Sequence, residues 1–132
     1  MAARTARGTD LYRDAFAASA SGDELLRMGW HGLRVYLRRA REAIGSGDRA
    51  DKAAAIHAAD RLLVFLQSIV AQGGDAELGA SLTRIYQALQ AALLNANLYD
   101  DAGALDWAER ELIALQRSVS GALKEDGNGE PR

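Results

Sequence analysis

Apolar residues recur along this chain at alternating spacings of three and four, which is the period of one helical face. The first stripe, within residues 23–44, consists of Leu26, Trp30, Leu33, Leu37, Ala40 and Ile44. Similar stripes run within residues 49–71, 76–98 and about 100–122, each beside polar positions that fill the opposite face. The strict apolar–polar alternation of a half-buried strand does not occur in the sequence. The pattern therefore predicts four amphipathic helices.

Short polar breaks separate the predicted helices. Gly45-Ser46-Gly47-Asp48 ends the first one, with a glycine suited to the left-handed C′ position and Asp48 suited to the next N-cap. Gly73-Gly74-Asp75 ends the second, and Asp100 or Asp101 starts the fourth. Because connections this short join antiparallel neighbours, we expect an all-α protein, an antiparallel up-and-down four-helix bundle with a short N-terminal arm.

Both ends of the chain differ from the predicted bundle. Residues 1–22 begin small, basic and polar, and we interpret them as a mobile N-terminal arm. Ser21 and Glu24 then form an S-x-x-E capping box, which places the start of the bundle at about residue 23. The bundle occupies residues 23–122 in this interpretation, and the charged, glycine-rich residues 123–132 form a disordered tail.

Composition limits the function classes. The 132 residues have a formal net charge of −2, which gives no reason to expect a nucleic acid partner. Without cysteine, disulfides, thiolate metal sites and a cysteine nucleophile are excluded. His31 and His57 lie on different predicted helices without a catalytic or metal-binding constellation, so we predict no enzyme, no metal and no cofactor. The sequence has neither a signal-peptide core nor a run of about 18 apolar residues, so we expect no membrane span.

Several short motifs follow one another along the predicted helices. They are Tyr12, Ser19-Ala20-Ser21-Gly22, Met28-Gly29-Trp30-His31-Gly32, Ala43-Ile44 before Gly47-Asp48, Ile85-Tyr86, and Leu93-Leu94-Asn95-Ala96-Asn97 ahead of Asp100. In this order and spacing they resemble the flagellar export chaperone family (FliS), over about residues 11–120. The chain is a divergent case, since Gly22 stands where the family has proline and Trp30 where it has tyrosine.

The resemblance implies a non-enzymatic chaperone in the cytoplasm. Such a protein binds the disordered C-terminal segment of flagellin, prevents its premature polymerisation and delivers it to the flagellar export apparatus. Apolar side chains of the client would lie in grooves between bundle helices. An export-gate component or a co-chaperone is a further expected partner. The alternative is a helical adaptor or dimerisation module with a different protein partner.

The residues that we assign to partner binding lie on the arm and on the second and third predicted helices. They are Leu11, Tyr12, Ile56, Leu63, Val70, Tyr86, Leu89, Leu93 and Asn97. Leu11 and Tyr12 either pack over the end of the bundle or cover a client groove. The others either belong to the core and its edge or form a second, half-exposed stripe that lines a groove between residues 49–71 and 76–98.

Two glycines inside the first predicted helix need an explanation. Gly29 and Gly32 each cost a helix about 0.8–1 kcal/mol relative to alanine. We therefore expect a close approach at these positions, either of a neighbouring helix, of the N-terminal arm or of the client backbone.

Four arginines, Arg27, Arg34, Arg38 and Arg41, share much of one face of the first predicted helix. One interpretation is a solvated face with acidic neighbours such as Glu42. The other is a docking surface for an acidic partner or an export component.

Overall fold

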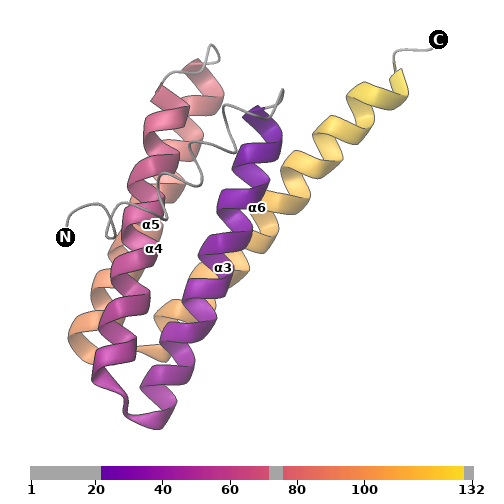
Figure 1. Cartoon of the computed structure of the whole chain (residues 1–132). Helices are drawn as coiled ribbons and strands as arrows, with labels where there is room; N and C mark the ends of the chain where they lie inside the picture. The colour runs from indigo at the N-terminus through magenta and orange to yellow at the C-terminus, as the bar shows by residue number, and fades with distance from the viewer. Residues whose placement is uncertain (1–21, 72–75, 130–132) are drawn as a thin grey trace.

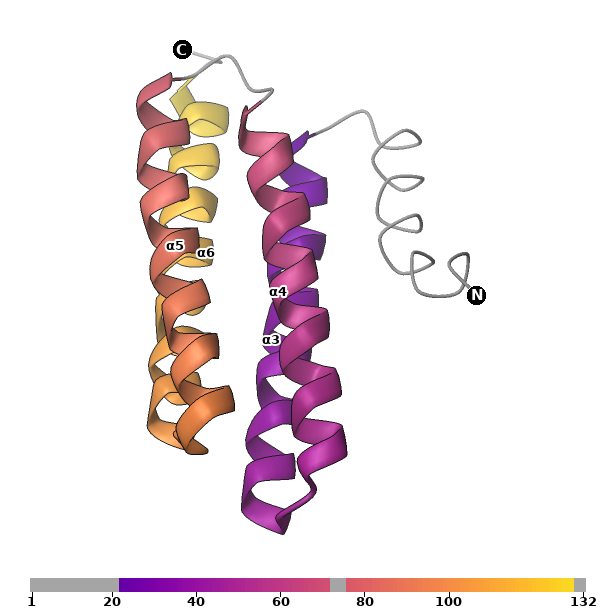
Figure 2. The same ribbon diagram turned by 90° about the vertical axis from the view of Figure 1, so that its left-hand side faces the viewer.

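The computed structural model describes residues 22–71 and 76–129, with four helices and no strand in these ranges. The helices are α3 (Gly22–Ser46), α4 (Arg49–Ala71), α5 (Ala76–Tyr99) and α6 (Ala102–Gly129). Successive helices run in opposite directions and lie side by side (Figures 1 and 2). α3 and α5 each contact both α4 and α6. The predicted all-α, up-and-down four-helix bundle is confirmed.

The turn between α3 and α4 has the capping geometry expected from its sequence. Gly47 adopts a left-handed conformation with φ of 75°. Its N–H donates to the Ile44 carbonyl at 3.2 Å, and the Asp48 N–H donates to the Ala43 carbonyl at 2.9 Å, which is the Schellman pattern. Asp48 Oδ1 then accepts the N–H of Asp51 at 3.0 Å and caps α4. The sequence prediction for this turn is confirmed.

The turn between α5 and α6 is built on two aspartates with different tasks. Asp101 caps α6, because its Oδ1 accepts the Ala104 N–H at 3.1 Å. Asp100 is left-handed, with φ of 53°, and its carboxylate accepts from Lys52 Nζ at 2.6 Å. Lys52 also donates to the Asn97 carbonyl at 3.0 Å, in the last turn of α5, where a cation is favoured. The sequence analysis named either Asp100 or Asp101 as the residue that starts α6, and the structure shows that Asp101 is the cap.

Apolar side chains from all four helices form one core. The largest fully buried ones are Trp30, Tyr86, Leu25, Leu33, Leu63, Leu66, Leu105 and Leu112. Each such side chain contributes roughly 1.5–3 kcal/mol through its removal from water. No charged side chain is buried among the described residues.

α3 and α4 approach each other closely at Gly29. A Cβ atom at this position would lie 2.5 Å from Cδ2 of Leu66, a core side chain of α4. The expected close approach of a neighbouring helix is therefore confirmed for Gly29. The absent side chain makes room for the leucine of the facing helix.

The far end of α6 differs from expectation. The helix continues to Gly129, whereas the sequence analysis placed a disordered tail at residues 123–132. Its backbone can continue because residues 102–130 contain no proline to interrupt the hydrogen-bond ladder. Residues 130–132 and Ser21 of the expected capping box lie outside the described residues.

By length and composition alone, α4 is long and apolar enough to span a membrane. The residues it buries in the bundle are Ala55, Ile56, Ala59, Leu62, Leu63, Phe65 and Leu66. A core helix meets the same criteria, so they do not by themselves indicate a span.

Candidate functional site

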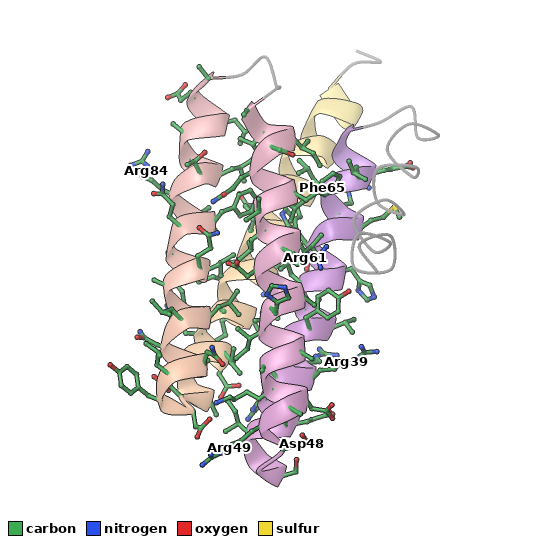
Figure 3. The ribbon with its side chains drawn as sticks, turned by 60° about the vertical axis from the view of Figure 1, so that its left-hand side comes forward. Arg39, Asp48, Arg49, Arg61, Phe65 and Arg84 are labelled. Atoms are coloured by element: carbon green, nitrogen blue, oxygen red, sulfur yellow. The ribbon has the colours of Figure 1, made fainter. Side chains whose placement is uncertain are left out.

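An open groove of about 250 Å³ lies between α4 and α5, which run side by side in Figure 3. Its lining residues are Ala53, Ile56, His57 and Asp60 of α4, and Gln90, Leu93, Leu94 and Asn97 of α5. The spacings of three and four within each set place them on one face of each helix. Since the helices are antiparallel, the two faces oppose each other along the groove.

The groove has an apolar floor and a mixed rim. Ile56 and Leu93 are buried and form the floor. His57, Leu94 and Asn97 are exposed on the rim. Leu94 is 58% exposed. The arrangement can bind an apolar side chain while hydrogen-bonding groups remain within reach.

The apolar rim continues along α5 beyond the groove. Leu98 follows Leu94 by one helical turn and is 61% exposed. Exposed apolar side chains that lie next to each other offer apolar area that a partner can cover. This edge of α5 is therefore the part of the groove best suited to contact another molecule.

Two polar cross-links between α4 and α5 limit the groove along its length. At one end, Lys52 of α4 binds the Asn97 carbonyl near the end of α5. Toward the other end, Gln67 Nε2 donates to Gln90 Oε1 at 3.4 Å, and Gln90 Nε2 donates to Asp60 Oδ1 at 3.4 Å. These bonds hold the two helices in register around the apolar floor.

The predicted partner-binding residues separate into several environments. The buried ones are Ile56, Leu63, Tyr86, Leu89 and Leu93, with exposed fractions of 0–6%. These five therefore belong to the core rather than to a half-exposed stripe, and two of them, Ile56 and Leu93, also line the groove. Each helix of a four-helix bundle packs against two neighbours, so its buried arc is wider than one stripe.

The remaining predicted residues lie at the edge of the core or outside it. Val70 is half-buried and packs against the core, close to Gly79 of α5. Asn97 is exposed and lines the groove. Leu11 and Tyr12 lie outside the described residues. Ile56, Leu93 and Asn97 are thus the three predicted residues that meet in the groove.

Five lining residues were not among those assigned to partner binding from the sequence. They are Ala53, His57, Asp60, Gln90 and Leu94. Each of the five lies within one helical turn of a residue that the sequence assigned to partner binding, so helical spacing could have included them. Polar residues such as Asp60 and Gln90 look like ordinary solvated positions until the opposing helix is placed.

The arginine face of α3 is largely paired with α6. Arg38 Nε lies 2.8 Å from Glu109 Oε2, and Arg41 Nε lies 3.1 Å from Asp106 Oδ1. Arg34 donates to Gln116 Oε1 at 3.3 Å. The acidic neighbours are therefore on α6 rather than at Glu42. Three of the four arginines join α3 to α6, which favours the interpretation as a paired surface.

A second groove, of about 630 Å³, lies between α3 and α4 near their connecting turn. Its α4 wall includes the small side chains of Ala54 and Ala58, and its rim carries both Arg39 and Glu42. Alanines offer little apolar area for anchoring a client side chain. The second groove has one large side chain with apolar area, Tyr36, whereas the α4–α5 groove presents an isoleucine and two leucines and is therefore the candidate site. No group of three or more His, Cys, Asp or Glu residues that could hold a metal ion occurs among residues 22–71 and 76–129.

Comparison with known proteins identifies the family. The family model described as "Flagellar protein FliS" matches residues 5–123, which includes the helices that form the groove. No match was found among the curated proteins.

Proposed function

The chain belongs to the FliS family and has a flagellar chaperone role, and we propose that its client is flagellin. In this proposal the protein binds the disordered C-terminal segment of flagellin in the cytoplasm. Binding prevents premature polymerisation, and the complex delivers flagellin to the export apparatus. The observation that carries the proposal is the open α4–α5 groove, whose apolar floor and exposed leucine rim occur on a chain of this family.

Helix-in-groove binding suits this surface. A client side chain that sits above Ile56 and Leu93 would also cover Leu94. Burial of one leucine-sized side chain contributes roughly 1.5–3 kcal/mol, so a few such contacts support binding. An unstructured client loses conformational entropy when it becomes ordered, which moderates affinity for the area buried. Moderate affinity is suitable for a cargo that must be released.

The partner-binding residues then have different roles in the proposal. Ile56, Leu93 and Asn97 contact the client. Leu63, Val70, Tyr86 and Leu89 support the groove from within the bundle. Leu11 and Tyr12 stay assigned to an arm that covers the client surface. An export-gate component or a co-chaperone remains a proposed further partner.

The alternative, a helical adaptor or dimerisation module, uses the same surface differently. A dimer would fill the α4–α5 groove with a second copy of the chain. Sedimentation equilibrium distinguishes the two, since the chaperone proposal predicts that added flagellin binds without competition from self-association.

The proposal is tested by calorimetric titration of the protein with a peptide from the C-terminal segment of flagellin from the same organism. A scrambled peptide of equal composition is the control. We expect saturable binding of the first peptide alone, with a negative heat-capacity change from apolar burial. In parallel, the protein should delay polymerisation of intact flagellin at equimolar concentration. Equal binding of both peptides, or no binding, would contradict the proposal.

A further inference from the structure

Asp60 sets the charge of the α4–α5 groove. Among the described residues that line the groove, Asp60 is the one with an acidic side chain, and none of them is a lysine or an arginine. The side chain is half-buried beside the apolar floor. An ionised carboxylate in such a position is stabilised by a donor, and most strongly by a cationic one.

The hydrogen bonds around Asp60 leave it able to accept more. Gln90 donates to Asp60 Oδ1 at 3.4 Å, which is long for an N–H···O bond. A carboxylate has about four lone-pair sites, so most of its acceptor capacity remains. Gln67 occupies the amide oxygen of Gln90, which orients the Gln90 amide nitrogen toward Asp60.

The nearest lysine of α4 is engaged outside the groove. Lys52, two turns before Asp60, has its ammonium group 2.6 Å from Asp100 and 3.0 Å from the Asn97 carbonyl. It therefore neutralises the end of α5 rather than the groove. Because Asp60 lines the groove, an occupant of the groove can use the acceptor capacity that Gln90 leaves.

We propose that Asp60 is a specificity-determining residue that selects a client segment with a lysine or arginine next to its apolar anchor. This inference rests on the proposed function. Ile56 and Asp60 are one helical turn apart, roughly 6 Å at 1.5 Å per residue. The client cation therefore lies three or four residues from the apolar anchor if the bound segment is helical, and two residues away if it is extended.

The substitution Asp60→Asn removes the charge, keeps the shape and retains an acceptor for Gln90. Because the carboxylate is half-buried rather than enclosed, we expect a moderate loss of affinity, about three- to tenfold. Asp51→Asn is the matched control. It makes the same change on the same helix, at an exposed residue that lines the α3–α4 groove instead.

The test measures dissociation constants for the wild type and both variants with two probes. The first is the peptide from the flagellin C-terminal segment, and the second is the same peptide with every lysine and arginine replaced by glutamine. We expect Asp60→Asn to weaken binding of the first peptide about three- to tenfold and to leave binding of the second unchanged. Asp51→Asn should have no effect beyond a small salt-dependent change.

The outcomes separate the two proposals. If the wild type binds the first peptide and Asp60→Asn binds it equally well, the inference about Asp60 is wrong while the proposed function stands. An equal loss for both peptides would also overturn the inference, since it would not depend on client charge. If the wild type binds neither peptide, the proposed function fails and Asp60 has no client to select.

Discussion

Trp30 of α3 and Tyr86 of α5 meet in the core, where Trp30 Nε1 donates to Tyr86 Oη at 3.0 Å. Both side chains are fully buried. The bond joins two helices that are diagonal in the bundle, since α3 and α5 each pack against α4 and α6. It satisfies the two polar atoms that these large rings bring into an apolar interior, and it fixes their relative position.

Removal of both partners of this pair should cost less than the sum of the two single removals. Tyr86→Phe leaves the Trp30 N–H buried without its acceptor, and we expect a loss of about 1–3 kcal/mol in the free energy of unfolding. Trp30→Phe should cost more, because it also leaves a cavity. The double variant should lose less unfolding free energy than the sum of the two single losses. Urea unfolding measures all three, and strict additivity would mean that the hydrogen bond contributes nothing to stability.

The burial of Tyr86 predicts a stability change at alkaline pH. Burial raises the pKa of Tyr86 from 10.0 to about 12, while the hydrogen bond from Trp30 acts in the opposite direction. The unfolded chain therefore releases this proton at lower pH than the folded one. The contribution of Tyr86 is fully present below pH 10 and is lost between about pH 10 and 12, at up to roughly 1.4 kcal/mol per pH unit.

Unfolding free energies of the wild type and of Tyr86→Phe across this range provide the measurement. The difference between the two proteins should change as the pH rises from about 10 to 12. A pH-independent difference would show that Tyr86 titrates normally in the folded state.

Gly29 and Gly45 provide a matched pair for the close contact of α3 with α4. Both lie in α3, but a Cβ atom at Gly29 meets Leu66 at 2.5 Å, whereas one at Gly45 meets nothing within 4 Å. Gly45→Ala should stabilise the protein by about 0.5–1 kcal/mol through helix propensity. At Gly29 the buried leucine must shift, and overpacking of this kind costs about 1–3 kcal/mol. The melting temperature of Gly29→Ala should lie below that of Gly45→Ala. Equal stabilisation by both substitutions would show that the helices separate easily.

Lys52 controls the ionisation of Asp100 at the end of α5. The hydrogen bond and the charge of Lys52 hold the pKa of the Asp100 carboxyl below its usual value of 3.8. Replacement of this lysine by methionine should raise that pKa toward the usual value, as NMR titration of the carboxyl carbon would measure. The Arg49 charge has a smaller influence, so Arg49→Met is the control. An unchanged titration in the Lys52 variant would mean that the pair does not form in solution.

The local pattern was sufficient to predict the helices and one turn. The stripe of residues 23–44 and the pair Gly47 and Asp48 specify their own geometry, because periodicity and capping act within a few residues of sequence. The same was not true of Tyr86 or Leu89. Whether such a residue lies in the core or beside a groove depends on the rotation of α5 against its neighbours, which the spacing within one helix does not determine.

The residues that line the groove also depend on how two helices pack, which the spacing within one helix does not determine. Asp60 and Gln90 can be recognised as groove residues only once α4 and α5 are placed together, because Gln90 donates to Asp60 across the interface. The partners of Arg38 and Arg41 also come from the far end of the sequence, on α6. Long-range pairs of this kind have no signature within a single helix.

The most direct test of the central claim compares Leu94→Asp with Leu78→Asp in binding to the flagellin C-terminal peptide. Both leucines are exposed on α5, at 58% and 49%, so neither change should unfold the bundle. Leu94 lies on the rim of the α4–α5 groove, and Leu78 lies about 24 Å away along the helix at 1.5 Å per residue. We expect Leu94→Asp to weaken binding at least tenfold and Leu78→Asp to leave the dissociation constant near that of the wild type. Equal affinities for the two variants would contradict the assignment of this groove to the client.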